Sequence, residues 1–302
     1  MNDATPADSA TSSPLLTPRV LIPLALFGVY VIWGSTYYGL RVALGGFPPF
    51  ALAAIRFVIA GGLLYALLCW RGAAPPTRRQ WFNCLVTGTL LLGAGNGGVC
   101  YAEQTVASGI AAVAVASAAL FMAIFAGLYG QWPSRMEWIG LVIGFVGIVV
   151  LNLGGELRGS PAGAIALVIS PVAWAFGSVW SKHQDMPEPM MSAAAQMLAG
   201  SVPLAIVSLA GGERFSTMPD ATALAAMAYL IVFGSLLGFS AYIYLLHHTR
   251  PALASSYSYA NPPVAVLVGV LLGGEVVSRL DIIGTVVIVA GVAAITLGKQ
   301  KG

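Results

Sequence analysis

The sequence predicts an all-α membrane protein, with ten transmembrane helices arranged as two inverted-topology five-helix repeats around a central cavity. Three observations predict this fold class. Of the 302 residues, 58% are hydrophobic and only 8% are charged, and the mean hydropathy is +0.85, whereas a soluble domain carries about 25% charged residues. The apolar residues form segments of roughly 20, the length of a helix that crosses a bilayer. The chain also repeats itself internally.

The apolar segments follow one another along the chain with short polar connections. Ten of them leave no room for a folded soluble domain, so the bilayer is expected to be the main solvent. They lie near residues 20–44, 48–70, 81–102, 107–130, 136–153, 161–182, 189–210, 222–247, 252–274 and 281–298.

Both ends of the chain are predicted to lie outside the membrane. Residues 1–18 are small, polar and acidic and lack the basic start of a signal peptide, so a disordered N-terminal tail is expected. Residues 19–154 form the first predicted five-helix repeat and residues 160–298 form the second, inverted one. Residues 299–302 are a C-terminal tail.

Lysine and arginine residues in the short loops predict the orientation of the spans, because such residues are enriched on the cytoplasmic side. With a cytoplasmic N-terminus, nine of them lie inside and four outside. Both termini are therefore expected in the cytoplasm. The inner set is Arg19, Arg71, Arg78, Arg79, Arg135, Lys182, Arg250, Lys299 and Lys301, and the outer set is Arg41, Arg158, Arg214 and Arg279.

An internal repeat relates the two halves of the chain. Residues 96–154 align with residues 240–298 without a gap, and the earlier spans align with small gaps. Five spans per repeat is an odd number, so the second repeat must enter the membrane from the opposite face, as is typical of secondary transporters. A duplication kept only for packing is the alternative. Matching positions include Gly130 and Gly274, Arg135 and Arg279, Gly147 and Gly291, Gly34-Ser35 and Gly177-Ser178, and Arg56 and Gln196.

Spans 1 and 6 carry aromatic and polar residues that hydrocarbon disfavours, and such residues normally face other helices or a watery cavity. Trp33 and Tyr37 are four residues apart and share a helix face, with Tyr38 on the neighbouring face. Trp174 and Ser178 have the same spacing in span 6. We expect these residues to line a cavity, and an interfacial aromatic belt is the alternative for Trp33 and Tyr38.

Span 9 begins with the most polar run in any apolar segment. Within it, Tyr257 and Asn261 share a helix face. Pro262 and Pro263 lack backbone donors, so they are expected to break the helical hydrogen-bond ladder one turn earlier. An opened helix at that depth is tolerated only inside protein or beside a cavity, which predicts a cavity next to this segment.

The predicted lining is rich in rings, hydroxyls and amides and almost free of charge. It suits a neutral or zwitterionic small molecule with an apolar or aromatic side chain, and not a phosphate, which would need several Arg or Lys. No Asp or Glu occurs in the middle of a span, which argues against obligatory proton exchange. Hydrogen-bonded contact between helices is the alternative role. The candidate binding residues are Trp33, Tyr37, Tyr38, Asn96, Tyr101, Ser117, Trp174, Ser178, Tyr242, Tyr257 and Asn261, and the candidate gate or hinge residues are Gly34, Gly177, Pro262, Pro263 and Arg56.

Arg56 places a full charge within span 2. It lies about two turns from Pro48-Pro49, so its side chain is expected to snorkel toward the outer interface. A role in a gate and a contact with helix-end carbonyls are the alternatives.

Other kinds of chemistry have little support in the sequence. The three cysteines lie in apolar segments at spacings that suit neither a disulfide framework nor a metal site, and no cofactor is expected. No catalytic acid and base are found together. The basic residues are scattered singly, so no nucleic-acid partner is expected. Gly140, Gly144 and Gly147 give span 5 a smooth packing face, which predicts that spans 5 and 10 form a scaffold.

These residues together carry a resemblance. The chain resembles the drug/metabolite transporter superfamily in its ten-span EamA branch, over about residues 20–298. The first half has Gln131 where the second has Glu275, and it has Ser117-Ala118-Ala119 where the second has Asn261-Pro262-Pro263, which departs from a perfect duplication. The motifs that carry the resemblance are Trp33-Gly34-Ser35, Pro49 with Arg56-Phe57, Gly274-Glu275, and Gly284 with Gly291.

The resemblance implies export of small metabolites, often amino acids, by alternating access, with spans 1, 3, 4, 6, 8 and 9 around the cavity. The aromatic lining is similar to that expected of YddG-like exporters of aromatic amino acids. The sequence therefore predicts a monomeric secondary transporter in a bacterial inner membrane that exports aromatic or large neutral amino acids or related metabolites. A drug or nucleotide-sugar carrier, a membrane enzyme and a channel are the alternatives.

Overall fold

The computed structural model describes residues 17–102, 104, 108–151, 161–215, 218–273 and 279–297. In these ranges the chain is helical and forms no strand. The predicted tails, apart from residues 17 and 18, lie outside the described residues, and so do Arg158, Gly274-Glu275, Lys299 and Lys301.

Helices occupy every range in which hydropathy predicts a span. Two of these stretches, residues 78–102 and 221–248, contain a π-helical segment between two α-helices. The elements are α1 (Pro18–Ala43), α2 (Pro49–Trp70), α3 (Arg78–Gly88), η2 (Thr89–Gly97), α4 (Gly98–Ala102), α5 (Ser108–Leu128), α6 (Arg135–Leu151), α7 (Pro161–Ser181), α8 (Pro189–Ala210), α9 (Ala221–Tyr229), η3 (Leu230–Phe239), α10 (Ser240–His248), α11 (Pro251–Ser255), α12 (Tyr257–Gly273) and α13 (Arg279–Leu297).

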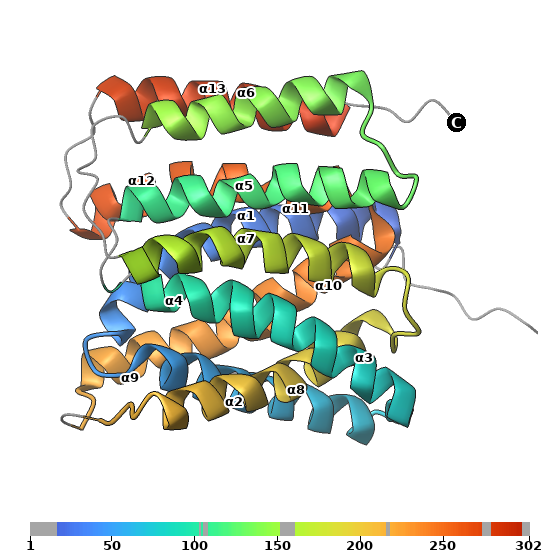
Figure 1. The fold of residues 1–302 in the computed structure, drawn as a ribbon, viewed down its shortest axis with the longest axis vertical. Helices are drawn as coiled ribbons and strands as arrows, with labels where there is room; N and C mark the ends of the chain where they lie inside the picture. The colour runs from blue at the N-terminus through green and yellow to red at the C-terminus, as the bar shows by residue number, and fades with distance from the viewer. Residues whose placement is uncertain are drawn as a thin grey trace, which may run out of the picture.

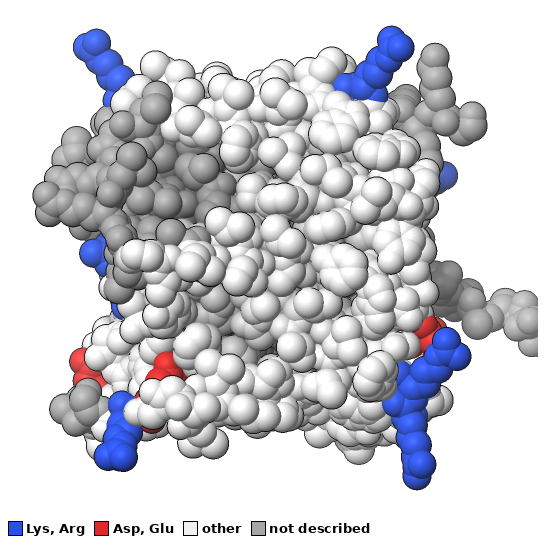
Figure 2. Space-filling model, viewed as in Figure 1, with Lys and Arg blue, Asp and Glu red and all other residues white. Residues whose placement is uncertain are grey.

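Length and composition mark much of this helical structure as membrane-spanning. Six stretches are long and apolar enough to cross a bilayer, and Val115–Leu128 and Ile282–Ile295 are shorter apolar helices. On the face shown in Figure 2, Lys and Arg lie at two opposite edges, and a wide uncharged band separates them. The helices run from one of these edges to the other (Figure 1), so the uncharged band matches the hydrocarbon layer. The six spanning stretches are Pro18–Ala43, Pro49–Trp70, Arg78–Ala102, Pro161–Ser181, Pro189–Ala210 and Ala221–His248.

The helices stack in layers along the long axis of the molecule (Figure 1). The α6–α13 pair forms one end of the stack, and α2 with α8 lies at the other end. Helices α1, α5, α7 and α12 lie between these pairs. α1 begins at the same edge of the bundle at which α13 ends, so the two ends of the helical core share one side.

The α6–α13 contact is a backbone contact made possible by glycines. A Cβ atom added to Gly291 would lie 2.5 Å from the amide nitrogen of Gly144, and one added to Gly140 would lie 2.7 Å from the carbonyl oxygen of Gly291. Gly147 approaches Ile288 in the same way, with a distance of 2.8 Å from its added Cβ to the Ile288 amide nitrogen. The predicted glycine packing face of this helix is therefore confirmed.

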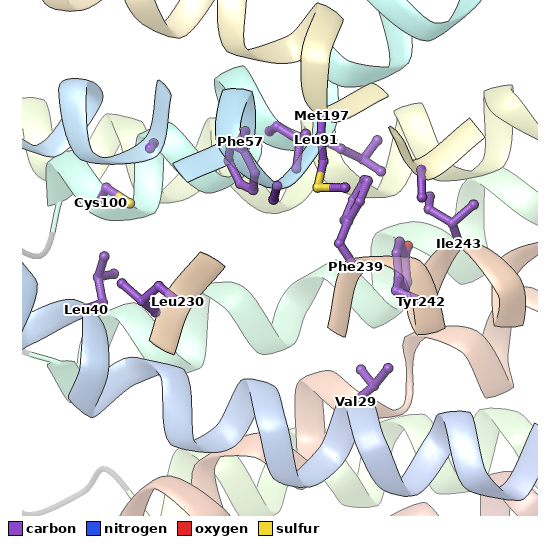
Figure 3. Packing of buried hydrophobic residues seen from close by; sticks show 14 of the residues in the cluster. Val29, Leu40, Phe57, Leu91, Cys100, Met197, Leu230, Phe239, Tyr242 and Ile243 are labelled. Atoms are coloured by element: carbon purple, nitrogen blue, oxygen red, sulfur yellow. The ribbon is translucent and has the colours of Figure 1, made fainter. Parts of the chain in front are cut away.

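A second glycine contact joins the two halves at the opposite end of the stack. A Cβ atom on Gly61 of α2 would lie 2.9 Å from the amide nitrogen of Leu198 in α8. Gly88 and Gly200 approach each other so closely that a Cβ on either would lie within 3.0 Å of the other's backbone. Between the two ends, large buried side chains fill the interior, and Phe239 and Tyr242 lie between Val29 of α1 and Met197 of α8 (Figure 3).

The structure corrects the expected position of the interruption in span 9. Pro262 and Pro263 lie inside α12, and the helix continues through both of them. The interruption falls earlier, at Ser256, between α11 and α12. Proline has a backbone φ that suits a helix, and the Asn261 amide beside the two prolines joins this part of α12 to α1. With its nitrogen facing two carbonyls, Asn261 donates to the Tyr257 oxygen at 3.1 Å and to the Tyr30 oxygen at 3.2 Å.

An ion pair ties the beginning of α6 to the beginning of α11. Arg250 Nη2 lies 2.9 Å from Glu137 Oε2, and the two side chains are 28% and 2% exposed. The same Glu137 oxygen accepts from the Ser134 amide at 2.7 Å, so the carboxylate also caps α6.

Replacing Glu137 by glutamine should destabilise the protein by about 1–3 kcal/mol, because Arg250 would lose its charged partner while its Nη1 atom stays buried. The measurement is thermal unfolding in detergent. Glu188→Gln is the matched control, since Glu188 is exposed at the start of α8 and its side chain caps nothing. Equal unfolding temperatures for the two variants would contradict the expectation.

Candidate functional site

A cavity lies among segments from both halves of the chain. Its volume is about 120 Å³, whereas one water molecule needs about 10–15 Å³ by the same measure, so it can hold a small organic molecule. α1, α2, η2, α4, α5, α7, η3 and α12 contribute to its wall. Seven of the predicted binding or gate residues line it: Trp33, Tyr37, Arg56, Asn96, Trp174, Tyr257 and Asn261.

Aromatic rings from four segments cluster at the wall of this cavity. Trp33 is the centre of the cluster, with its ring centroid 4.7 Å from that of Tyr257, 5.4 Å from Tyr242 and 5.7 Å from Trp174. The contacts with Trp174 and Tyr257 are edge-to-face, the arrangement that aromatic quadrupoles favour. The cluster therefore forms a firm apolar wall.

Hydrogen bonds hold these rings in place. Trp174 Nε1 donates to the Tyr242 hydroxyl at 3.1 Å, and that hydroxyl lies 2.6 Å from Ser178 Oγ. Ser178 Oγ donates to the carbonyl of Trp174 at 2.7 Å, so its proton is used and Tyr242 must donate to Ser178. The three bonds close a cycle behind the cavity wall. Ser178 and Tyr242 are fully buried there and support Trp174 from behind.

The two π-helical segments shape the cavity from opposite halves. η2 contributes Gly95 and Asn96 to the wall, and η3 contributes Gly234, whose carbonyl accepts from Trp33 Nε1 at 2.9 Å. A Cβ atom on Gly95 would lie 2.9 Å from the Trp174 ring, so glycine there makes room for the indole. π-helical segments are rare and are often found at functional sites.

The structure corrects the expected direction of Arg56. Its side chain does not extend to the outer interface: it lines the cavity and is only 6% exposed. Nη2 donates to Asn96 Oδ1 at 2.8 Å, and the guanidinium carbon lies 4.3 Å from the centroid of the Phe57 ring. The hydrogen bond with Asn96 of η2 therefore holds the Arg56 side chain inside the protein instead of at the membrane interface.

Other candidates lie away from the cavity lining. Tyr38 is exposed on α1, and Tyr101 is exposed on α4, where its ring stacks on Phe50 at 5.9 Å. Ser117 is half-buried on α5. None of these three residues lines the cavity, so their positions do not support the binding role, which stays a prediction.

The predicted hinge glycines lie at close helix contacts beside the cavity. A Cβ atom on Gly34 would be 2.5 Å from Cβ of Val264 in α12, and one on Gly177 would be 2.5 Å from a methyl carbon of Leu91 in η2. Sequence reasoning missed Ser170, which lines the cavity from α7 and donates to the carbonyl of Ala94 at 3.1 Å. The Ser170-Pro171 pair within an apolar span was the available signal.

Removing the Ser178 hydroxyl should weaken the cycle behind Trp174. We expect Ser178→Ala to lower stability by about 1 kcal/mol, because the buried Tyr242 hydroxyl loses its acceptor, and to weaken ligand binding because the indole is less firmly held. Ser201→Ala is the control, since Ser201 is also buried but bonds only to its own helix, at Leu198. Thermal unfolding and ligand affinity of both variants test this, and an equally large effect at Ser201 would contradict it.

The fold and the cavity define a class: a multi-pass helical membrane protein with an internal cavity. Residues 21–153 and 161–297 each match the EamA-like transporter family. The chain belongs to this family, which lies within the drug/metabolite transporter superfamily. The family indicates a transporter rather than an enzyme.

Similar proteins agree with this assignment. The chain is 46% identical over 284 residues to the "Uncharacterized inner membrane transporter YedA" of Escherichia coli (strain K12), with 93% of each chain covered. It is 26% identical to the "Uncharacterized transporter YvbV" of Bacillus subtilis (strain 168), with 92% of each covered. A crystal structure of a protein with 23% identity shares the fold at a TM-score of 0.78, over 91% of this chain and 97% of that one. The protein is therefore a multi-pass inner-membrane transporter.

Proposed function

We propose that this transporter works by alternating access and exports aromatic or large neutral amino acids, or related small metabolites. The observation that carries the proposal is the cavity, which joins an aromatic wall of Trp33, Trp174 and Tyr257 to the polar groups of Arg56 and Asn96. An amino acid with a large apolar side chain has the matching division into one polar and one apolar end.

The finer fold prediction is part of this proposal: ten spans in two inverted repeats of five. The helix contacts support it, because each contact has an equivalent in which the corresponding helices of the other half take part. α1 packs on α12 as α7 packs on α5, and α1 contacts η3 as α7 contacts η2. α2 packs on α8, and α6 packs on α13, so each of these helices packs on its equivalent in the other half. The π-helical segments η2 and η3 also fall at matching positions of the repeat.

The position of the cavity supports a state closed toward the cytoplasm. The lining residues of α1 lie in its second half, those of α2 lie in its first half, and those of α7 lie near its middle, so the cavity is displaced toward the edge at which α1 ends. Toward the other edge, the Trp174–Tyr242–Ser178 cycle and the bond between Tyr30 and Ser256 close the path. With cytoplasmic termini, this arrangement is outward-facing.

Counterflow in proteoliposomes tests the proposal. Vesicles preloaded with unlabelled phenylalanine, tryptophan or leucine should accumulate the labelled amino acid without an imposed proton gradient. A labelled cationic drug and a nucleotide sugar are the comparison substrates. Counterflow of either of these without amino-acid counterflow would overturn the proposed substrate class, and a strict need for a proton gradient would overturn the proposed coupling.

A further inference from the structure

We propose that Arg56 binds the carboxylate of the transported molecule, so that the cavity requires a carboxylate and does not require an ammonium group. This inference rests on the proposed function and names the chemical group that the same cavity selects.

Among the described residues, none provides a counter-ion for Arg56. Its one hydrogen bond among the described contacts goes to the neutral amide of Asn96, and Nε is buried without a partner. A buried charge is costly unless it is paired and hydrogen-bonded. Arg56 therefore lacks an anionic partner among the described residues, and an anion bound in the cavity would supply one.

None of the carboxylates with described contacts reaches Arg56, and Glu188 is exposed at the start of α8. Glu137 pairs with Arg250, and the two oxygens of Glu213 accept from the amides of Phe50 and Ala51 at 3.1 and 2.8 Å. Asp185 accepts from Gln80 and Asp220 caps α9. No Asp or Glu is among the described residues of the cavity wall. A ligand ammonium would thus find no opposite charge there, whereas a ligand carboxylate would find Arg56.

The position in the second half that aligns with Arg56 carries no charge. Gln196 occupies the matching position in α8, is equally buried, and donates to Ser192 within its own helix at 2.8 Å. The same helix position therefore accommodates a neutral side chain, and it does not line the cavity. The arginine adds what glutamine lacks, a planar guanidinium that can bind a carboxylate through two parallel hydrogen bonds.

The cavity also orients such a ligand. Asn96 holds Nη2 from the side of η2, and Cys100 lies 3.6 Å from the same Asn96 oxygen, so the amide is fixed. The aromatic wall around Trp33 and Trp174 lies in the same cavity and suits the apolar end of the ligand. In the resulting arrangement, the ligand carboxylate binds Arg56 and the ligand ring packs against the indoles of Trp33 and Trp174.

Three ligands that differ by one group test the inference on the purified full-length protein: phenylalanine, 3-phenylpropionate, which lacks the ammonium, and phenethylamine, which lacks the carboxylate. We expect the first two to bind and phenethylamine to bind about tenfold more weakly or not at all. Arg56→Gln should weaken both acids by about tenfold or more, and Arg56→Lys should have an intermediate effect. Gln196→Met is the control variant and should leave all three affinities unchanged.

A second measurement separates ligand binding from a structural role. Arg56→Gln should keep or raise the unfolding temperature of the ligand-free protein, because it removes an uncompensated buried charge. A marked fall would assign Arg56 to the structure and overturn the inference. Equal binding of phenethylamine and 3-phenylpropionate would also overturn it, while amino-acid transport would stand. If neither this set nor leucine, 4-methylpentanoate and isopentylamine bind, the proposed function fails together with the inference.

Discussion

Replacing Gly291 by leucine is expected to leave little correctly folded protein. The added Cβ would lie 2.5 Å from the nitrogen and 2.7 Å from Cα of Gly144, and 2.8 Å from the oxygen of Gly140. All three are backbone atoms, so no side-chain rotation can relieve the clash, and α13 must move away from α6. Overpacking of this kind costs about 1–3 kcal/mol when side chains can adjust, and a backbone clash should exceed that. The measurements are the monodisperse yield after detergent extraction and the unfolding temperature.

Gly62→Leu is the matched control for this substitution. Gly62 lies in α2 and has nothing within 4 Å of its added Cβ, so the same change of residue should have little effect there. Because α6 and α13 contribute no residue to the described wall of the cavity, any Gly291→Leu protein that remains folded should bind ligand with unchanged affinity. Normal yield and stability of Gly291→Leu would show that the α6–α13 pair tolerates separation and is not a scaffold.

The helical ranges could be predicted from sequence because hydropathy alone determines which segments enter a bilayer. The interruptions inside those ranges could not. The prolines of α12 predicted a break at their own position, yet the backbone is interrupted at Ser256, where a tertiary contact with Tyr30 is made. The π-helical segments η2 and η3 likewise pack against Trp174 and Trp33, and no local composition encodes those contacts. The number of membrane crossings and the inversion of the repeats stay predictions.

In the candidate site too, helical spacing predicted some side-chain positions, whereas others depend on contacts with distant parts of the chain. Helical spacing placed Trp33 and Tyr37 on one face, and both line the cavity. It could not place Arg56, because the partner that holds the side chain inside, Asn96, lies 40 residues away in sequence. It could not separate lining from support either: Ser178 shares the spacing of Tyr37 but is turned toward Tyr242 behind the wall. Side-chain partners from other helices decide such cases.

Trp33→Ala is expected to weaken ligand binding by about tenfold or more. Trp33 contacts three other rings, and each such pair contributes roughly 0.5–1.5 kcal/mol beyond area burial. Its removal would also free the carbonyl of Gly234 and enlarge the cavity, so the remaining rings would no longer be held at contact distance from a ligand. Trp33→Phe should keep most of the ring contacts, lose only the bond to Gly234, and bind with an intermediate affinity.

Trp70→Ala controls for the loss of a tryptophan in general, since Trp70 is 83% exposed at the end of α2. Binding of phenylalanine to each purified variant is the measurement, together with the unfolding temperature without ligand. If Trp33→Ala folds and binds as tightly as the unmodified protein, the aromatic cluster is a packing feature and the ligand must bind elsewhere. If its affinity falls while Trp70→Ala is unaffected, the Trp33 indole in the cavity wall is also the surface that the ligand contacts. A carrier can then couple binding to closure, because Trp33 contacts α12 and η3 as well as the ligand.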